Sequence, residues 1–569
     1  MRTDQADVIL VNGRVLTMDA TSSVAKAVAV RAGSIIAVGS DDEVRALRGR
    51  DTTVIDARGR TVLPGINDSH LHGCAFGLNR PPLSVDVSYP AVRSIADVRA
   101  VIAAAVARTP EGEWIRGNGW DLGYLRECQA DPARLPTRAD LDAVAPHHPV
   151  YLQDFSGHMT WANSRAFEVA GIEHSSTSPE GGVIVRDASG SPTGLLQEGA
   201  QDLVQRVVPP LTRTDREQAI ATAITTLHAE GITSFTEPGL GPGGDGLFAG
   251  ALGGEALEIY ADLARAGALP IRVSALLLFT GMSGGAEEIA RGLASYRYPT
   301  GIDPRVFRVI GVKIFADGIP PNKTAWMREE YAGGGHGSLC VHGATEGMRG
   351  EELEAMIRLA HRAGHQVGVH VTGDRGIDAV VEAFARAVEE YPRPDPRHYV
   401  IHGDFVGAES LATMAKYGFG VNMNPTVKWT IADLMTEMLG EQRSAYQWPV
   451  RTAMEAGVTV AASSDAPVTF PNWRQGVAGM MLRESKASGR SVGPEECVSL
   501  DQALRAYTIN AAWQDFAEDW KGSLEVGKVA DICVLGGDLE ASNPHDIPDI
   551  PVALTIFDGR VVFDSRDSR

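Results

Sequence analysis

Cysteine is scarce in this sequence: the 569 residues include only five cysteines, and no Cys-x-x-Cys pair occurs. The thiols are therefore expected to be free, in a reducing compartment, rather than part of a disulfide framework. No apolar run reaches the roughly 18 residues that a membrane helix needs, and the N-terminus lacks the basic and apolar regions of a signal peptide. We expect a cytoplasmic protein without a membrane partner.

An excess of positive charge is also absent, because the formal net charge is -20 and the pI is near 5.2. This balance argues against nucleic acid and anionic membranes as partners. It says nothing else about the substrate, which is expected to be a small molecule. Hydrophobic residues at 44% and charged residues at 22% are ordinary for a globular protein, and the length predicts two or three domains. The oligomeric state is open, with a homo-oligomer among the options.

The two ends of the chain share a pattern of short apolar strands separated by turns. Asn12-Gly13, Ala32-Gly33 and Asp558-Gly559 each separate two apolar runs and predict hairpins. Neither end is large enough to bury a core alone. Residues 1–62 and 522–569 are therefore predicted to form one composite β-sandwich.

Residues 63–521 alternate strand-like and helical segments, which indicates a parallel sheet with helices outside. The clearest strands are expected at 366–371, 398–402, 418–423 and 458–462, and helices at 351–362, 375–390 and 410–417. Their spacing, about one βαβ unit of ~30 residues from one strand to the next, predicts an α/β fold, a TIM-like (β/α)8 barrel.

Too few strands occur between His72 and Lys313 to fill that stretch of the chain. A large insertion after the first barrel strand is therefore predicted at about 75–210, where it could cap the barrel mouth. Within it we expect a helix over 160–170 and a hairpin around 187–190.

Ligand-type residues follow the apolar runs of this region. His70 and His72 stand two apart, a spacing that points both imidazoles to one side of a strand, although two hydrogen-bonded structural histidines are the alternative. His370 and His402 each end an apolar strand, on the face where barrels place their chemistry. Asp465 follows another such run; a carboxylate there can bind a metal and accept a proton, although a turn or helix N-cap is the alternative.

Lys313 lies inside an apolar strand, where lysine is rarely buried without a partner. A free ammonium would repel a metal, whereas a lysine carbamylated by CO2 would offer two anionic oxygens. Carbamylation requires a neutral amine, and hence a pKa lowered from ~10.4. The alternative is a salt bridge, for example to Asp317, and the residues alone leave both open.

Taken together, these motifs resemble the metal-dependent amidohydrolase superfamily, and more closely its amidohydrolase-3 branch of YtcJ-like and N-substituted formamide deformylase-like proteins. The resemblance covers essentially the whole chain. It rests on residues 63–72, 154–158, 194–198, 313–318, 370–375, 401–402, 464–467 and 527–531.

The resemblance implies a barrel with a composite sandwich and hydrolysis by metal-bound hydroxide. His70, His72 and Asp465 would bind a first metal, His370 and His402 a second, and a carboxylated Lys313 would bridge a binuclear centre. Asp465 would also act as general base and later protonate the leaving group. His158, Asn424 and Trp120 are candidate substrate contacts, with a structural role as the alternative for each.

The expected activity is hydrolysis of a non-peptide C–N bond, in an amide or an N-substituted formamide. A one-metal deaminase, lactonase or ester hydrolase of the same fold is the alternative, and so is a non-catalytic scaffold. One or two divalent ions are expected; imidazole and carboxylate ligands suit zinc, and also manganese, iron or cobalt.

Overall fold

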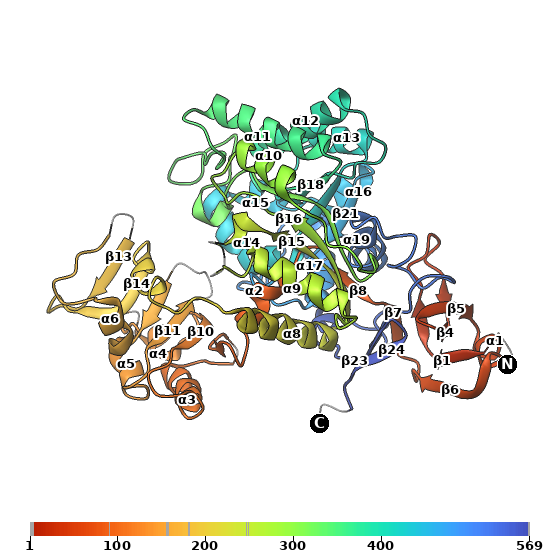
Figure 1. Ribbon diagram of the computed structural model, residues 1–569, viewed down its shortest axis with the longest axis horizontal. Helices are drawn as coiled ribbons and strands as arrows, with labels where there is room; N and C mark the ends of the chain where they lie inside the picture. Colours follow the sequence, from red (N-terminus) through yellow and green to blue (C-terminus); the bar gives the residue numbers. More distant parts are fainter. Residues whose placement is uncertain are drawn as a thin grey trace. The chain divides into compact units, whose positions relative to one another are not determined.

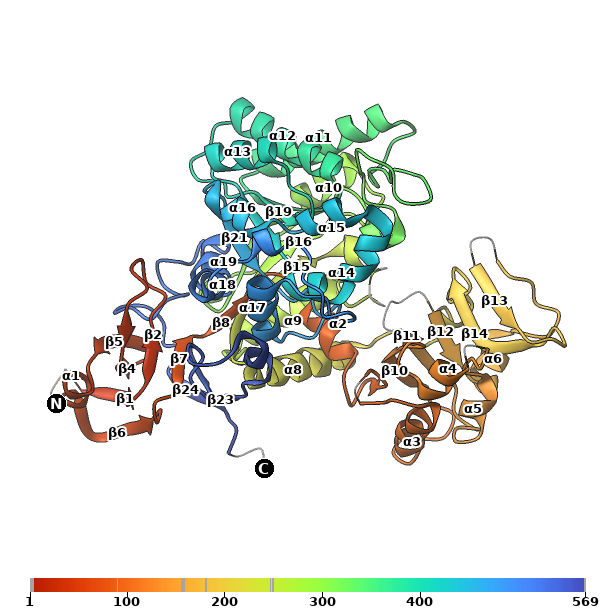
Figure 2. The ribbon, with the colours of Figure 1, turned by 180° about the vertical axis from the view of Figure 1, so that it is seen from behind.

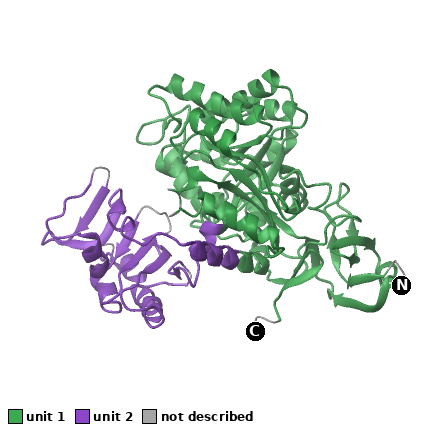
Figure 3. Ribbon diagram, in the orientation of Figure 1, with its two compact units in different colours: residues 1–73, 224–569 green, residues 74–223 purple. Residues whose placement is uncertain are grey.

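The structure is a computed structural model that describes residues 5–89, 91–131, 133–154, 159–179, 182–245, 247 and 250–566. The chain forms two compact units (Figure 3). The first contains Met1–Gly73 and Ile224–Arg569, and the second contains Cys74–Ala223. No helix in the described ranges is long and apolar enough to cross a membrane.

An eight-stranded parallel sheet forms the centre of the first unit, with its strands in the same order in space as in the sequence (Figure 1). The strands are β8 (Ile66–Asp68), β15 (Ile232–Leu240), β16 (Arg272–Leu277), β17 (Phe307–Phe315), β18 (Gln366–Val371), β19 (Tyr399–His402), β20 (Gly420–Met423) and β21 (Thr459–Ala462). The edge strands β8 and β21 approach each other, since the Ser69 hydroxyl donates to the Ala462 carbonyl oxygen at 2.7 Å. The predicted TIM-like barrel is confirmed, and parallel strands bring their carboxyl ends to one rim.

Helices connect the barrel strands and cover the sheet (Figure 1). They are α9 (Gly254–Arg265), α10 (Ala286–Ser295), α11 (Glu346–Arg362), α12 (Asp374–Glu390), α13 (Ala408–Tyr417), α14 (Pro425–Leu439), α15 (Glu441–Tyr446), α16 (Val450–Glu455), α17 (Trp473–Leu482), α18 (Leu500–Ala506) and α19 (Ile509–Gln514). Helix α8 (Arg213–Ala229), which precedes β15, begins in the second unit and ends in the first. Helix α12 shows the underlying pattern, because Ile377, Val380 and Phe384 recur at helical spacing and are buried. The Thr345 side chain caps α11 by accepting from the Met348 amide.

Strands from both ends of the chain form two further sheets in the first unit (Figure 2). One has the order β5-β4-β1-β6 and the other β24-β23-β22-β7-β2-β3. The strands are β1 (Ala6–Val11), β2 (Arg14–Leu16), β3 (Val24–Ala25), β4 (Ala27–Arg31), β5 (Ser34–Gly39), β6 (Arg48–Asp56), β7 (Thr61–Pro64), β22 (Ile532–Leu535), β23 (Val552–Phe557) and β24 (Arg560–Asp564), with the short helix α1 (Asp41–Arg45). Side chains of both sheets share one core, so the composite sandwich is as predicted.

Two of the three predicted hairpins form and one does not. The turns at Ala32-Gly33 and Asp558-Gly559 join antiparallel partners, β4 with β5 and β23 with β24. The Asn12-Gly13 prediction is wrong, because β1 pairs with β4 and β6 whereas β2 pairs with β3 and β7. Leu10 and Val15 both enter the core between the two sheets, so the chain crosses from one sheet to the other at this turn.

The second unit is built on a mixed sheet of order β13-β14-β12-β11-β10-β9. Its elements are α2 (Gly73–Leu78), β9 (Val85–Asp86), α3 (Ile95–Val106), β10 (Ile115–Trp120), α4 (Arg126–Ala130), α5 (Arg138–Asp142), β11 (Val150–Asp154), β12 (Met159–Ala162), α6 (Ser164–Ala170), β13 (Gly182–Arg186), β14 (Pro192–Glu198) and α7 (Asp202–Gln205). The hairpin expected around 187–190 joins β13 to β14. The helix expected over 160–170 begins only at Ser164, because β12 pairs with β11 and β14, and Asn163 then caps α6.

Candidate metal centre

Three ligand-type side chains meet at the carboxyl rim of the barrel. His70 follows β8, His402 ends β19 and Asp465 follows β21. Each offers a ligand atom that lies within 4.8 Å of those of the other two, and His70 Nε2 is 3.2 Å from Asp465 Oδ1. Both histidines are buried, whereas the Asp465 side chain keeps 14% of its surface exposed. The carboxylate can therefore reach both a bound ion and a substrate.

His72 lies at the margin of this cluster, with its Nε2 3.8 Å from Asp465 Oδ1. The strand expected at His70-Leu71-His72 is not present, because β8 ends at Asp68 and the motif lies in the following loop. Neighbouring loops and strands hold this segment instead: the Leu71 amide donates to the Thr236 carbonyl oxygen and the His72 amide to that of Ala466. The two imidazole rings are 5.3 Å apart.

His402 and Asp465 both have left-handed backbone conformations, with φ of 74° and 55°. Such a conformation costs a non-glycine residue about 1–3 kcal/mol, and it is retained where the surroundings over-determine it. Here the Asp465 amide donates to the His70 carbonyl oxygen, and the Trp448 indole N–H donates to that of His402. Packing around the rim thus fixes the direction of both side chains.

His370 lies beside the cluster, with its ring 4.6 Å from that of His402. Its Nε2 is 3.1 Å from the Gly318 carbonyl oxygen, which can only accept a hydrogen bond. His370 therefore donates its Nε2–H there and presents its lone pair at Nδ1. A second-metal role would engage that Nδ1 atom in this arrangement.

Lys313 is 1% exposed inside β17, and within the described ranges it makes no salt bridge. Burial lowers the pKa of its ammonium to about 7. The alternative salt bridge to Asp317 does not form, because that carboxylate accepts from the amides of Trp326, Thr372 and Gly373. Lys313 is therefore a buried amine that is easily deprotonated.

Burial also lowers the pKa of the rim histidines, most strongly for His70 and His370, and to about 4 for His72. These imidazoles are neutral at pH 7, so each keeps a nitrogen lone pair. Neutral imidazole is the form that binds a metal ion.

Glu237 is a site residue that the sequence analysis missed. It lies on β15, is fully buried, and places Oε1 3.5 Å from His72 Nδ1 while Oε2 accepts from the Gly73 amide. Its sequence signal is a carboxylate within an apolar strand near the rim. Carboxylates in this position orient metal-binding histidines.

The three predicted substrate contacts have different outcomes. Asn424 is fully buried and accepts a hydrogen bond from His402 Nδ1 at 2.6 Å, so it supports a ligand-type histidine from behind. Trp120 packs in the core of the second unit and donates to the Leu152 carbonyl oxygen, a core position rather than a pocket wall. His158 lies outside the described residues.

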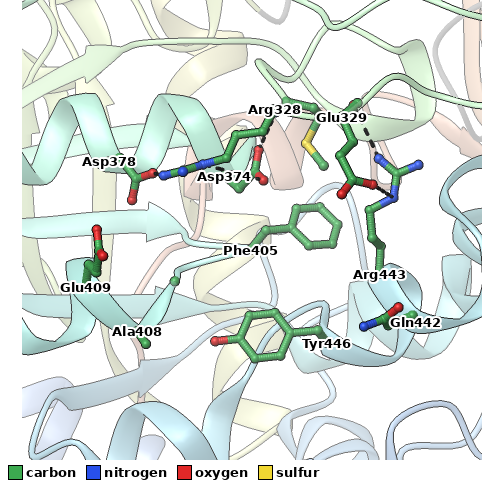
Figure 4. A pocket seen from close by; sticks show the side chains of 12 residues that line it. Arg328, Glu329, Asp374, Asp378, Phe405, Ala408, Glu409, Gln442, Arg443 and Tyr446 are labelled. Atoms are coloured by element: carbon green, nitrogen blue, oxygen red, sulfur yellow. Dashed lines mark hydrogen bonds and ion pairs between the residues drawn. The ribbon is translucent and has the colours of Figure 1, made fainter.

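A cavity of about 460 Å³ occurs elsewhere in the first unit, and none of the predicted ligands lines it. Figure 4 shows its charged side chains facing one another, with Arg328 beside Asp374 and Asp378, and Arg443 beside Glu329. Phe405 and Tyr446 form its apolar part. The cavity and the ligand cluster are separate features.

The cluster fits a divalent metal ion. Two neutral nitrogens and a carboxylate are a donor set that zinc and its neighbours accept. In addition, Nδ1 of the buried His70 finds no hydrogen-bond partner in the part of the chain that the structure describes. Buried polar atoms are rarely left unpartnered, so this atom indicates a group that completes the site.

The fold and the cluster together are those of a barrel enzyme with a candidate divalent-metal site at its carboxyl rim. The chain belongs to the Amidohydrolase family, whose model matches residues 53–563, and is accordingly a metal-dependent hydrolase.

Individual relatives agree with this assignment over almost the full chain. The N-substituted formamide deformylase of Arthrobacter pascens is 30% identical over 98% of this chain and 98% of its own length. The putative amidohydrolase YtcJ of Bacillus subtilis is 28% identical over 97% and 98%. The solved structure of an uncharacterized metal-dependent hydrolase from Pyrococcus furiosus covers 94% of this chain and 99% of its own, with a TM-score of 0.70 and 23% identity, and it shares the fold.

Proposed function

We propose that this protein hydrolyses a C–N bond of a small amide or N-substituted formamide. The observation that carries the proposal is the convergence of His70, His402 and Asp465 at the barrel rim. The similarity to a formamide deformylase over nearly the whole length supports the choice of bond.

In this proposal His70, His402 and Asp465 hold a first divalent ion, with His72 at its edge, so His402 moves from the second ion of the sequence prediction to the first. When bound, the ion would acidify a water molecule and polarise the carbonyl of the substrate. Asp465 accepts the proton of the attacking water at its carboxylate and then delivers it to the leaving nitrogen. Its partial exposure suits this exchange, since the buried histidines are not open to the substrate in the same way.

We further propose zinc as the ion and a carboxylated Lys313 as a ligand of a second ion. The buried amine of Lys313, which makes no salt bridge in the described ranges and whose pKa burial lowers to about 7, supports carboxylation. His370 is the neighbouring imidazole for that second ion.

One observation favours a one-metal alternative. The three clustered ligands make a single compact site, whereas His370 uses its Nε2 on the Gly318 carbonyl oxygen. In that case Lys313 is an ordinary amine, and deamination or ester hydrolysis joins the candidate reactions.

The test is a hydrolysis assay over a panel of N-substituted formamides, acetamides, lactones and esters, with protein purified without chelator and analysed for metals. We expect metal in the protein and turnover of a formamide or amide above that of the esters. Turnover of only lactones or esters would support the alternative, and metal-free protein would refute both. Incubation with ¹³C-labelled bicarbonate and carbon NMR would then show whether Lys313 carries a carbamate.

A further inference from the structure

A continuous chain of buried polar side chains runs behind the metal cluster. It links His402 to Asn424, Asn424 to Ser463, Ser463 to Asn422, Asn422 to Ser69 and Ser69 to the carbonyl oxygen of Ala462, at 2.6, 2.8, 3.0, 2.6 and 2.7 Å. The four linking side chains are fully buried. Asn422 lies on β20 and Asn424 directly follows it, whereas Ser463 and Ser69 follow β21 and β8. The chain of hydrogen bonds therefore links β21 to β8, the two edge strands between which the barrel closes.

The hydrogen bond from Ser69 to Ala462, at the end farthest from His402, determines the direction of every other hydrogen bond in this chain of side chains. The Ala462 carbonyl oxygen can only accept, so the single hydroxyl proton of Ser69 points to it. Ser69 Oγ must then accept from the Asn422 amide nitrogen, which turns the Asn422 carbonyl oxygen toward Ser463.

The same reasoning continues to the metal cluster. Ser463 donates its proton to Asn422, and its oxygen therefore accepts from the amide nitrogen of Asn424. Asn424 consequently turns its carbonyl oxygen to His402, whose Nδ1 must carry the proton. In neutral imidazole, a proton on Nδ1 leaves the lone pair on Nε2.

We propose that Asn424, Ser463, Asn422 and Ser69 are positioning residues that lock His402 in its Nδ1–H tautomer and so reserve its Nε2 for the metal. An isolated asparagine cannot do this, because its amide group can flip and offer either oxygen or nitrogen. The directed chain removes that freedom, since a flipped Asn424 would face Ser463 with the wrong atom. The metal part of the inference rests on the proposed function, whereas the tautomer itself does not.

The decisive comparison is between two variants of nearly equal size at one position. Asn424→Asp keeps an oxygen that accepts from His402 Nδ1, whereas Asn424→Leu removes it. We expect Asn424→Asp to bind Zn²⁺ within about threefold of the unaltered protein, and Asn424→Leu to bind it 10–100-fold more weakly. A purely structural role would make the charged aspartate at least as harmful as the leucine.

Ser463→Ala tests the chain of hydrogen bonds without changing Asn424, the partner of His402. It removes the acceptor that holds the Asn424 amide nitrogen, and we expect about tenfold weaker Zn²⁺ binding because the amide can then flip. Asn510→Leu is the matched control: it also removes an asparagine hydrogen bond to a barrel strand, the one that Asn510 Nδ2 donates to the Val460 carbonyl oxygen, yet it has no link to His402.

The experiment combines nitrogen NMR of metal-free protein labelled with ¹⁵N-histidine and Zn²⁺ affinity from competition with a chelator. The His402 signal is assigned by its loss in His402→Gln. We expect Nδ1 of His402 to be protonated in the unaltered protein, in Asn424→Asp and in Asn510→Leu, with Nε2–H appearing in Ser463→Ala and in Asn424→Leu.

A His402 protonated at Nε2 in the unaltered protein would overturn the inference, and this readout requires only the assignment variant His402→Gln to fold. So would a Ser463→Ala protein that keeps both the tautomer and the affinity. Failure of the unaltered protein to bind Zn²⁺ would instead refute the proposed function, since the tautomer is measured without metal.

Discussion

Two regions of the first unit each contain a buried or partly buried carboxylate, and the two carboxylates differ in their hydrogen bonds. Beside the sandwich, Asp531 receives two hydrogen bonds from the guanidinium of Arg272, at 2.7 and 3.0 Å, and a third from the Asp558 amide. At the barrel rim, Asp465 has histidine nitrogens at 3.2 and 3.8 Å. Nδ1 of His70 also has no hydrogen-bond partner in the described residues.

The difference distinguishes an ion pair that stabilises the fold from the site proposed to bind a metal. A buried charge that is fully hydrogen-bonded stabilises one conformation and is costly to disrupt. A group of neutral imidazoles, a lysine with a lowered pKa and a carboxylate with incomplete contacts is instead ready for a ligand. A charge pair with one exposed partner, such as Glu329 with the half-buried Arg443, contributes little to stability or to ligand binding.

The largest effect is expected at the rim. Asp465→Asn keeps the size of the side chain and removes the proton acceptor, so we expect kcat on the preferred amide to fall about 10³-fold, equivalent to about 4 kcal/mol of barrier. The urea midpoint should stay within experimental error of the unaltered protein. Undiminished turnover in this variant would show that Asp465 is not the proton carrier.

The next largest effect is expected beside the sandwich. Arg272→Met leaves Asp531 buried without its guanidinium, which should lower the free energy of unfolding by about 3 kcal/mol. Urea denaturation measures this loss, and kcat of the folded protein should be unchanged. Pairing the change with Asp531→Asn should restore part of the stability; a double variant less stable than the single one would contradict the comparison.

A pH effect is expected at a buried histidine outside the rim. His398 accepts from the Val367 amide at Nδ1 and donates from Nε2 to His361, and burial lowers its pKa well below the ordinary value. Between its folded pKa and about 6.5 the unfolded chain binds more protons, so stability rises with pH in this window and is lost as pH falls.

The unaltered protein should therefore lose up to about 1.4 kcal/mol per pH unit from His398 below pH 6.5. His398→Gln removes the titrating group, and its urea midpoint should fall less between pH 7 and pH 5.5. Parallel pH profiles for the two proteins would be inconsistent with a neutral, buried His398.

The smallest effect is expected at the cavity shown in Figure 4. Glu329 is 77% exposed and lies 3.7 Å from Arg443, so Glu329→Gln should change stability by less than about 0.5 kcal/mol and leave turnover unaltered. A larger loss of activity would show that this cavity takes part in catalysis, contrary to our expectation.

Local sequence signals predicted the barrel well because its strands and helices carry the matching apolar period. The strand expected at 366–371 coincides with β18, and the ligand-type residues after β8, β19 and β21 meet as their strand-end positions indicated. The Asn12-Gly13 signal was equally strong locally but was overridden by the packing of two sheets. A turn motif predicts where the chain bends but does not predict which strands pair.

The supporting contacts of the site could not be predicted from the sequence. Asn424 contacts Ser463, and Asn422 contacts Ser69, which is 353 positions away. Only the closed barrel brings these side chains together, so Asn424 resembled a substrate contact in the sequence. Glu237 was missed for the same reason. Its partner His72 precedes the second unit in the sequence, whereas Glu237 follows it.

The most direct test is X-ray diffraction from crystals of the protein grown without chelator, with anomalous data collected at the zinc edge. We predict an anomalous peak within bonding distance of His70, His402 and Asp465, with His402 bound through Nε2. A peak elsewhere, or metal-free density with the three side chains turned apart, would contradict the assignment of this rim as the catalytic centre.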